Sequence, residues 1–232
     1  MTRLFNGIVS FGSALLLAVT LIGAGFAAVA IPDAATATLS RAYSGCDQPD
    51  TPFTADELTS MAIAGKRYTF DDNDREKLDA AIAEANAAAE ADGRASASTR
   101  ESAARSLPAD AISHLDDVYR VACVAKPALA IVAALCIAGL ARVAVRIGRR
   151  ALGRTLMAGG GLVLAAFCAL GAWAAIDFDG LFAAFHSLFF QAGTWTFPYD
   201  SLLITLYPTA FWMGMGGIWL AVTCGLSILA VL

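Results

Sequence analysis

The fold of this chain is decided by residues 4–32, which read LFNGIVSFGSALLLAVTLIGAGFAAVAIP and contain no charged side chain. A helix needs roughly 20 apolar residues to cross the hydrocarbon core of a bilayer, and this stretch is long enough. Two further uncharged stretches, residues 155–176 and 201–232, meet the same requirement. These stretches predict three membrane-spanning helices.

A fourth span is predicted between residues 126 and 147. Its apolar centre is short, but Arg142 and Arg146 can extend from its inner end toward water, and Lys126 marks its outer end. The composition agrees, because 58% of the residues are apolar, 16% are charged and the mean hydropathy is +0.63. We therefore expect an all-α membrane protein with four transmembrane helices and a helical extracellular cap between the first and second spans.

The predicted boundaries divide the chain into seven segments. These are a first transmembrane helix (1–31), an extracellular cap (32–125), a second transmembrane helix (126–147), a basic cytoplasmic loop (148–154), a third transmembrane helix (155–176), an aromatic extracellular loop (177–207) and a fourth transmembrane helix (208–232). The first span could also be read as a cleaved signal, with small residues at 28–30 and 35–37 as cleavage sites. Its apolar stretch exceeds the ~7–15 residues of a signal core, so we expect an uncleaved anchor.

Charge sorting predicts the orientation of the spans. Arg3 precedes the first span, and a cluster of arginines without any acidic residue separates the second from the third: Arg142, Arg146, Arg149, Arg150 and Arg154. Positive charge marks the cytoplasmic side of membrane proteins. We therefore expect a multi-pass protein of the cell membrane with both termini cytoplasmic and all 20 acidic residues outside. The net charge of -4 averages two compartments and does not indicate nucleic-acid binding.

The predicted cap contains few strong signals. Residues 71–93 begin with aspartates and end at a glycine, which favours an exposed helix with both ends capped. Residues 94–106 are rich in Ala and Ser without apolar periodicity and are expected to form a flexible linker. Cys46 and Cys123 are both external, so a disulfide between them is possible, although two cysteines define no geometry. Neither the oligomeric state nor a cofactor is indicated.

The two histidines of the chain, His114 and His186, are the candidate catalytic residues. His114 precedes the second span and His186 follows the third, so both should lie at the same depth on the outer side. Asp117 shares a helical face with His114, and Phe182, Phe189 and Phe190 share one with His186. Ser187 is adjacent to His186 and diverges from it by ~100° on a helix, which argues against a Ser-His pair.

Other interpretations use the same residues. A histidine in an interfacial aromatic belt is more often a packing residue than a catalyst, which leaves a non-catalytic membrane scaffold open. A metal-binding or metal-handling membrane protein is also open, with His114, His186, Asp117 and Asp179 as ligands, although no HxxH or HxxE spacing supports it. Chelator sensitivity would favour the metal, and an unchanged alanine variant would favour the scaffold.

Several motifs are similar to one known family. Residues 177–182 (DFDGLF), 185–190 (FHSLFF), 195–198 (WTFP) and 200–204 (DSLLI), followed by Pro208 and Phe211-Trp212, resemble the second-loop signature of the lipoprotein intramolecular transacylase (Lit) family of bacterial membrane proteins. Residues 114–118 (HLDDV) look like the first histidine motif of that family. The likeness covers the four-span layout and these two blocks.

The resemblance implies acyl transfer on a diacylated lipoprotein within the membrane lipid. The sn-2 acyl chain of the diacylglyceryl group would move to the amine of the N-terminal cysteine, at a site facing the extracellular side. An imidazole with a pKa near 6.5 suits proton transfer from such an amine, and the other imidazole would stabilise the oxyanion or protonate the leaving oxygen. The residues expected to orient the histidines or enclose the substrate are Asp116, Asp117, Phe182, Phe185, Phe189, Phe190, Trp195, Tyr199, Asp200 and Tyr207.

Overall fold

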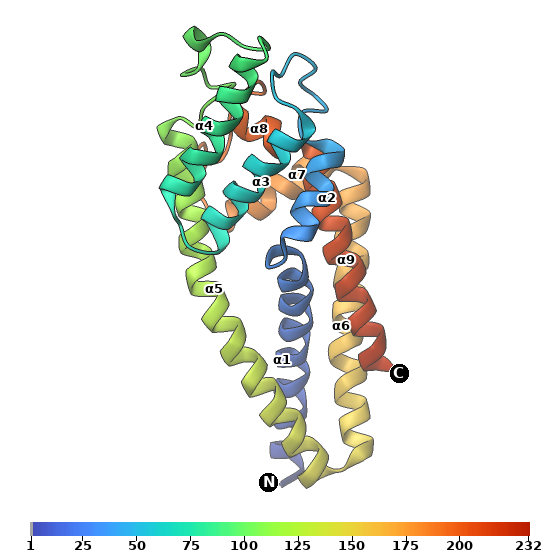
Figure 1. Ribbon diagram of the computed structural model, residues 1–232. Helices are drawn as coiled ribbons and strands as arrows, with labels where there is room; N and C mark the ends of the chain where they lie inside the picture. Colours follow the sequence, from blue (N-terminus) through green and yellow to red (C-terminus); the bar gives the residue numbers. More distant parts are fainter. Residues whose placement is uncertain (1) are drawn as a thin grey trace. The chain divides into compact units, whose positions relative to one another are not determined.

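The computed structural model describes residues 2–232, and every regular element in that range is a helix (Figure 1). The elements are α1 (Thr2–Ala30), α2 (Asp33–Tyr43), α3 (Ala55–Phe70), α4 (Arg75–Ala91), η1 (Ala97–Thr99), α5 (Ala109–Arg142), η2 (Val143–Ile147), α6 (Arg149–Ile176), α7 (Phe178–Ser187), α8 (Leu202–Leu206) and α9 (Thr209–Val231).

Within residues 2–232, four helices are long and apolar enough to cross a membrane: α1, α5 continued by η2, α6 and α9. This confirms the predicted all-α membrane fold. Helix α5 is continuous through Pro127, where its uncharged part begins. The preceding turns carry charged residues and lie outside the stretch that can cross the bilayer; these residues are Asp110, Asp116, Asp117, Arg120 and Lys126.

The chain divides into two compact units. We call the first the membrane unit, which comprises the residues up to Ala28, Val124–Leu181 and Gly217–Leu232. The second is the cap unit, which comprises Val29–Cys123 and Phe182–Gly216. The cap unit therefore contains more than the predicted cap, because most of the predicted aromatic loop folds with it.

Close helix packing holds the membrane unit together at α6. A Cβ atom added at Gly159 would lie 2.8 Å from the carbonyl oxygen of Ala14 in α1. One added at Gly160 would lie 2.8 Å from that of Ser227 in α9. Glycine lets transmembrane backbones approach this closely because no side chain separates them. Helices α1 and α9 therefore both pack tightly against α6.

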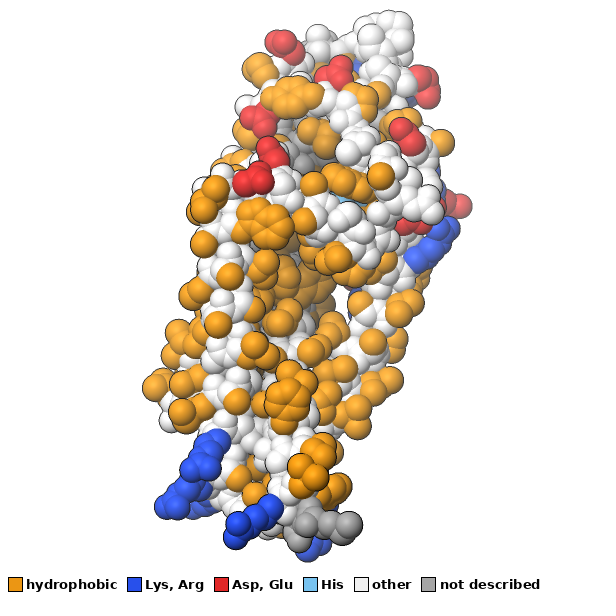
Figure 2. All heavy atoms as spheres, turned by 180° about the vertical axis from the view of Figure 1, so that it is seen from behind, with side chains coloured by type: hydrophobic (Ala, Val, Ile, Leu, Met, Phe, Trp, Pro, Cys, Tyr) orange, Lys and Arg blue, Asp and Glu red, His pale blue; other side chains and the backbone are white. Residues whose placement is uncertain are grey.

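The connection between α5 and α6 is shorter than the sequence predicted. The expected basic loop at 148–154 is wrong, because α6 begins at Arg149 and Gly148 alone separates it from η2. Gly148 turns the chain with φ 116°, which glycine adopts without a steric penalty. The Arg, Ala and Leu residues that follow are good helix formers and continue as helix. Figure 2 shows basic side chains gathered at this end of the membrane unit.

The cap unit has its own apolar core. Its members come from α3, α4, α8 and the first turns of α5, and include Met61, Leu78, Ala111, Leu115, Leu202 and Leu206. A capping box between Thr54 and Glu57 fixes the start of α3, and the Asp74 side chain caps α4. This core holds the start of α5, where His114 lies.

Two expectations for the cap need correction, and the structure answers one question that the sequence left open. The helix predicted within residues 71–93 exists as α4, but it is only partly exposed, because Leu78, Ile82 and neighbouring residues are buried. The segment 94–106 is held by hydrogen bonds rather than free, since Arg105 is 3% exposed and bonded to Asn86 and Glu90. In the described structure Cys46 and Cys123 are exposed free thiols, so the possible disulfide is absent.

Candidate active site

His114 lies in the second turn of α5 and points into an aromatic environment. The residue is 8% exposed. Its ring centroid lies 5.0 Å from that of Phe190 and 5.6 Å from that of Phe197. The Nδ1 atom is buried and has no hydrogen-bond partner among the described residues. An unpaired buried polar atom costs free energy, so its presence favours a functional role over a purely structural one.

His186 lies in the last turn of α7 and is 9% exposed. Its Nδ1 atom lies 2.9 Å from the carbonyl oxygen of Phe182, one helical turn earlier. A carbonyl oxygen can only accept, so this hydrogen bond requires the proton on Nδ1 and leaves Nε2 with the lone pair of the neutral ring. The rings of Phe182 and Trp195 enclose His186 at centroid distances of 4.0 and 4.8 Å.

The two imidazoles converge, as the sequence predicted. Their centroids are 6.1 Å apart and the ring planes differ by 31°. Phe190 contacts both, at 5.0 Å from His114 and 5.7 Å from His186. The buried Nε1 atom of Trp195 also has no hydrogen-bond partner in residues 2–232. We call His114, His186, Phe182, Phe190, Trp195 and Phe197 the histidine site.

Burial determines the protonation of this pair. Loss of water, and to a smaller extent the neighbouring His186, lower the pKa of His114 to about 4 against the opposing charge of Asp117. Burial also lowers the pKa of His186, although its bond to the Phe182 carbonyl favours the charged form. Both rings are therefore neutral at pH 7 and able to accept a proton.

The two aspartates next to His114 face other partners. Asp116 accepts a hydrogen bond from Tyr68 Oη, and Asp117 forms an ion pair with Arg120 at 2.6 Å. Burial and the Asp116 carboxylate raise the pKa of Tyr68 to about 12. The expectation that either carboxylate orients His114 by a hydrogen bond is thus wrong, because both are engaged elsewhere. Asp117 acts on His114 only through its charge.

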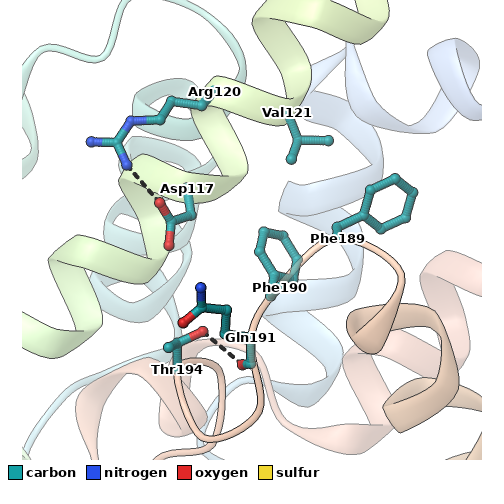
Figure 3. A pocket seen from close by; sticks show the side chains of 7 residues that line it. All are labelled: Asp117, Arg120, Val121, Phe189, Phe190, Gln191 and Thr194. Atoms are coloured by element: carbon teal, nitrogen blue, oxygen red, sulfur yellow. Dashed lines mark hydrogen bonds and ion pairs between the residues drawn. The ribbon is translucent and has the colours of Figure 1, made fainter.

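A pocket of about 410 Å³ opens next to the histidine site (Figure 3). Helix α5 lines it with Asp117, Arg120 and Val121, and the loop after α7 lines it with Phe189, Phe190, Gln191 and Thr194. Phe190 belongs to both regions, because its ring lines the pocket and contacts both imidazoles. The aromatic wall of the site therefore continues into a cavity with a charged edge.

Several expected site residues lie apart from the histidines. Tyr199 is 64% exposed and its hydroxyl donates to the Asp47 carbonyl, which ties two loops together. Tyr207 donates its hydroxyl to the Ala62 carbonyl and supports α3. Asp200 is exposed. Phe185, by contrast, contacts His186, with centroids 5.8 Å apart and its own ring exposed.

The sequence did not single out Phe197 or Trp212 for the site. Phe197 contacts His114, and Trp212 lies with its centroid 5.8 Å from that of Phe182. Both belong to the motif blocks at 195–198 and 211–212, which was the available signal. Arg120 was also missed, although its spacing of three from Asp117 on a helix predicts their ion pair.

A metal site finds little support in the geometry. In the described part of the chain, no three His, Cys, Asp or Glu side chains gather in a way that could hold a metal ion. The histidine site instead pairs two neutral imidazoles with phenylalanine rings and an unpaired indole N–H. Such an arrangement suits proton transfer in a dry environment.

Comparisons of the sequence and of the structure with known proteins point to the same family. The family model described as lipoprotein intramolecular transacylase Lit matches residues 94–212. A solved structure of the membrane integral lipoprotein intramolecular transacylase Lit from Bacillus cereus is similar with a TM-score of 0.73 and 17% identity, over 97% of this chain and 92% of that one. A variant of that protein with histidine replaced by alanine gives a TM-score of 0.68 and 16% identity, over 99% and 91%. No curated protein sequence matches the chain significantly.

Proposed function

The chain belongs to the lipoprotein intramolecular transacylase Lit family, and from this premise we propose that it moves the sn-2 acyl chain of a diacylated lipoprotein to the amine of the N-terminal cysteine. The new bond joins the amine nitrogen to the acyl carbon, and the bond that breaks joins that carbon to the sn-2 glyceryl oxygen. The amine loses a proton and the glyceryl oxygen gains one. The reaction thus balances within one substrate molecule, without water or a cofactor.

We assign the proton transfer to His186. The hydrogen bond from Nδ1 to the Phe182 carbonyl supports this role, because it fixes the ring and leaves the lone pair on Nε2. An α-amine has a pKa of roughly 7.7–8.0 and is mostly protonated at neutral pH, so a base must remove its proton before attack. The same imidazole can then pass this proton to the leaving glyceryl oxygen.

His114 and Trp195 would stabilise the oxyanion that forms on the acyl carbonyl. The support is their unpaired polar atoms, both buried beside His186: the Nε1–H of Trp195, and Nδ1 of His114, which donates when the neutral ring carries its proton there. Donors that are fixed in a water-poor site stabilise developing charge strongly, because they need no reorganisation. With the imidazole centroids 6.1 Å apart, one reacting carbon can lie within reach of both rings.

The aromatic rings would keep water from the reacting ester. Phe182, Phe190 and Phe197 pack on the two imidazoles at centroid distances of 4.0 to 5.7 Å. Water at this site would hydrolyse the ester instead of allowing the amine to attack. Because ester and amine belong to one molecule, their effective concentration supplies several kcal/mol of the barrier once the substrate is folded correctly.

The proposed orientation places this site on the outer side of the membrane. The basic residues from Arg142 to Arg154 lie where α5 passes into α6, and positive charge is retained in the cytoplasm. Both termini would then be cytoplasmic.

The convergence of the two histidines is the observation that carries this proposal. Mass spectrometry of a reporter lipoprotein from cells with and without the protein tests it. We expect an acyl group on the N-terminal amine and a free sn-2 hydroxyl only when the protein is expressed. An unchanged diacylglyceryl form with a free amine, despite confirmed expression, would contradict the proposal.

A further inference from the structure

The pocket beside the histidine site has a charged edge that the proposed chemistry leaves unused. Asp117 and Arg120 lie on α5, while Gln191 and Thr194 come from the loop after α7 (Figure 3). Phe190 joins the pocket to the imidazoles, since its ring lines the pocket and lies 5.0 Å from His114. A group bound here is therefore next to the reacting centre.

The ion pair in the pocket is easily exchanged. Arg120 contacts Asp117 at 2.6 Å, but the arginine side chain is 72% exposed and the aspartate side chain 35% exposed. Exposed pairs at helical spacing contribute little to stability, because solvent screens them and the arginine side chain loses entropy on pairing. A cation brought by a ligand can thus replace Arg120 without a large loss.

Asp117 is also close enough to act electrostatically on the imidazole of His114. It lies one helical turn from His114 on the same face of α5, and its negative charge opposes the fall in the His114 pKa. A cation bound to Asp117 therefore lies within reach of the histidine site. Asp117 is the one acidic side chain among the described residues that line the pocket.

We propose, on the basis of the proposed function, that Asp117 binds the α-ammonium group of the substrate's N-terminal cysteine, in exchange for Arg120. Asp117 is then a positioning residue that recognises the charged amine before His186 deprotonates it. The acylated product carries a neutral amide at the same nitrogen. The carboxylate therefore binds the substrate more tightly than the product, which favours release of the product after transfer.

Binding of two unreactive lipopeptides to the full-length protein tests this proposal. Both carry ether-linked alkyl chains that cannot be transferred; one has a free N-terminal amine and the other an acetylated one. We expect the wild-type protein to bind the free amine about ten-fold more tightly, the effect of one charge-assisted hydrogen bond. In Asp117→Asn this preference should fall to about two-fold or less.

The matched control is Asp79→Asn. It removes an exposed ion pair at helical spacing, Arg75 to Asp79 on α4, which lies outside the pocket. This variant should keep the wild-type preference. A full preference in Asp117→Asn would overturn the proposal.

A second variant gives the opposite change and does not depend on the folding of Asp117→Asn. Arg120→Gln leaves the carboxylate unpaired, so the preference for the free amine should rise several-fold. An unchanged or reduced preference would also overturn the proposal. Transfer from an ester-linked lipopeptide is measured in a separate experiment. Failure of that transfer would contradict the proposed function, whereas the binding ratios test only the role of Asp117.

Discussion

Two buried polar groups in the cap unit differ in how completely they are paired. We call Arg105, Asn86, Glu90 and Thr99 the arginine cluster. Arg105 is 3% exposed, and its guanidinium donates to Asn86 and Glu90 at 2.8 Å and to Thr99 at 2.7 Å. The histidine site is similarly buried, yet His114 Nδ1 and Trp195 Nε1 lack partners in the described chain.

This difference separates a structural role from a functional one. A paired buried charge fixes neighbouring segments, here α4 and the loop that follows it, and leaves nothing to bind a ligand. Unpaired buried atoms cost free energy in the resting protein and persist where another requirement maintains them. The comparison predicts that substitutions in the histidine site affect activity, whereas substitutions in the arginine cluster affect stability.

The largest expected effect is on the transfer rate of the histidine variants. His114→Phe and His186→Phe should each lower the rate by roughly 10²–10⁴-fold, because a proton carrier or an oxyanion donor is lost. His114→Phe should retain the melting temperature, since an unpaired nitrogen is replaced by an apolar ring of similar shape. Mass spectrometry of a purified lipopeptide and thermal unfolding in detergent measure the two quantities. Transfer at the wild-type rate by either variant would contradict a catalytic role for that histidine.

The next largest effect is on stability. Arg105→Met should lower the free energy of unfolding by about 3 kcal/mol, because Asn86 and Glu90 lose a buried partner. Activity per folded molecule should stay close to wild type. Arg100→Met is the control: its side chain is 48% exposed and pairs with the same Glu90, so the loss should be below about 1 kcal/mol. Equal losses in the two variants would show that burial does not distinguish these arginines.

The tryptophans provide a finer comparison. Trp195→Phe keeps an aromatic ring but removes the unpaired indole N–H, and should slow transfer by about a hundred-fold without lowering stability. Trp219→Phe is the control, because its indole donates to the Ile22 carbonyl at 3.1 Å within the membrane unit. That variant should lose about 1 kcal/mol of stability and no activity. Steady-state rates with a lipopeptide and melting curves measure the two effects. Unchanged transfer by Trp195→Phe, or slowed transfer by Trp219→Phe, would contradict the role of Trp195 in oxyanion stabilisation.

The smallest effect concerns pH. The pKa of His114 is lowered to about 4 in the folded protein, so the unfolded chain binds its proton first as the pH falls. Stability should therefore decrease between about pH 6.5 and pH 4, by about 2 kcal/mol at pH 5. In His114→Phe this part of the pH dependence should disappear. Unfolding curves of the wild type and of His114→Phe at pH 7 and pH 5 measure this difference. An equal loss of stability in the two proteins between pH 7 and pH 5 would contradict the account.

The sequence predicted the parts of the structure that depend on local composition. Uncharged stretches such as residues 155–176 identify membrane spans directly, because a helix in hydrocarbon must be apolar along its length. The convergence of His114 and His186 could be predicted from their positions beside two spans. The Asp74 cap of α4 was likewise visible as an aspartate cluster.

Features that depend on pairing between distant residues could not be predicted. Arg105 lies in an Ala- and Ser-rich segment without periodicity, and its partners Asn86 and Glu90 lie on α4. Nothing local distinguishes it from a solvated arginine. Asp117 was expected to orient His114 because both share a helical face, but sharing a face does not determine which partner a side chain selects. Whether Cys46 and Cys123 form a disulfide was left open by the sequence for a similar reason, since position outside the membrane does not by itself bring two thiols together.

The most direct test of the central claim is the fate of a labelled acyl chain. A diacylglyceryl lipopeptide with ¹³C in the sn-2 chain alone is incubated with the purified protein, and the products are fragmented by mass spectrometry. The account predicts the label as an amide on the N-terminal cysteine and the unlabelled sn-1 chain still as an ester. Label recovered as free fatty acid, or an unlabelled chain on the amine, would contradict it.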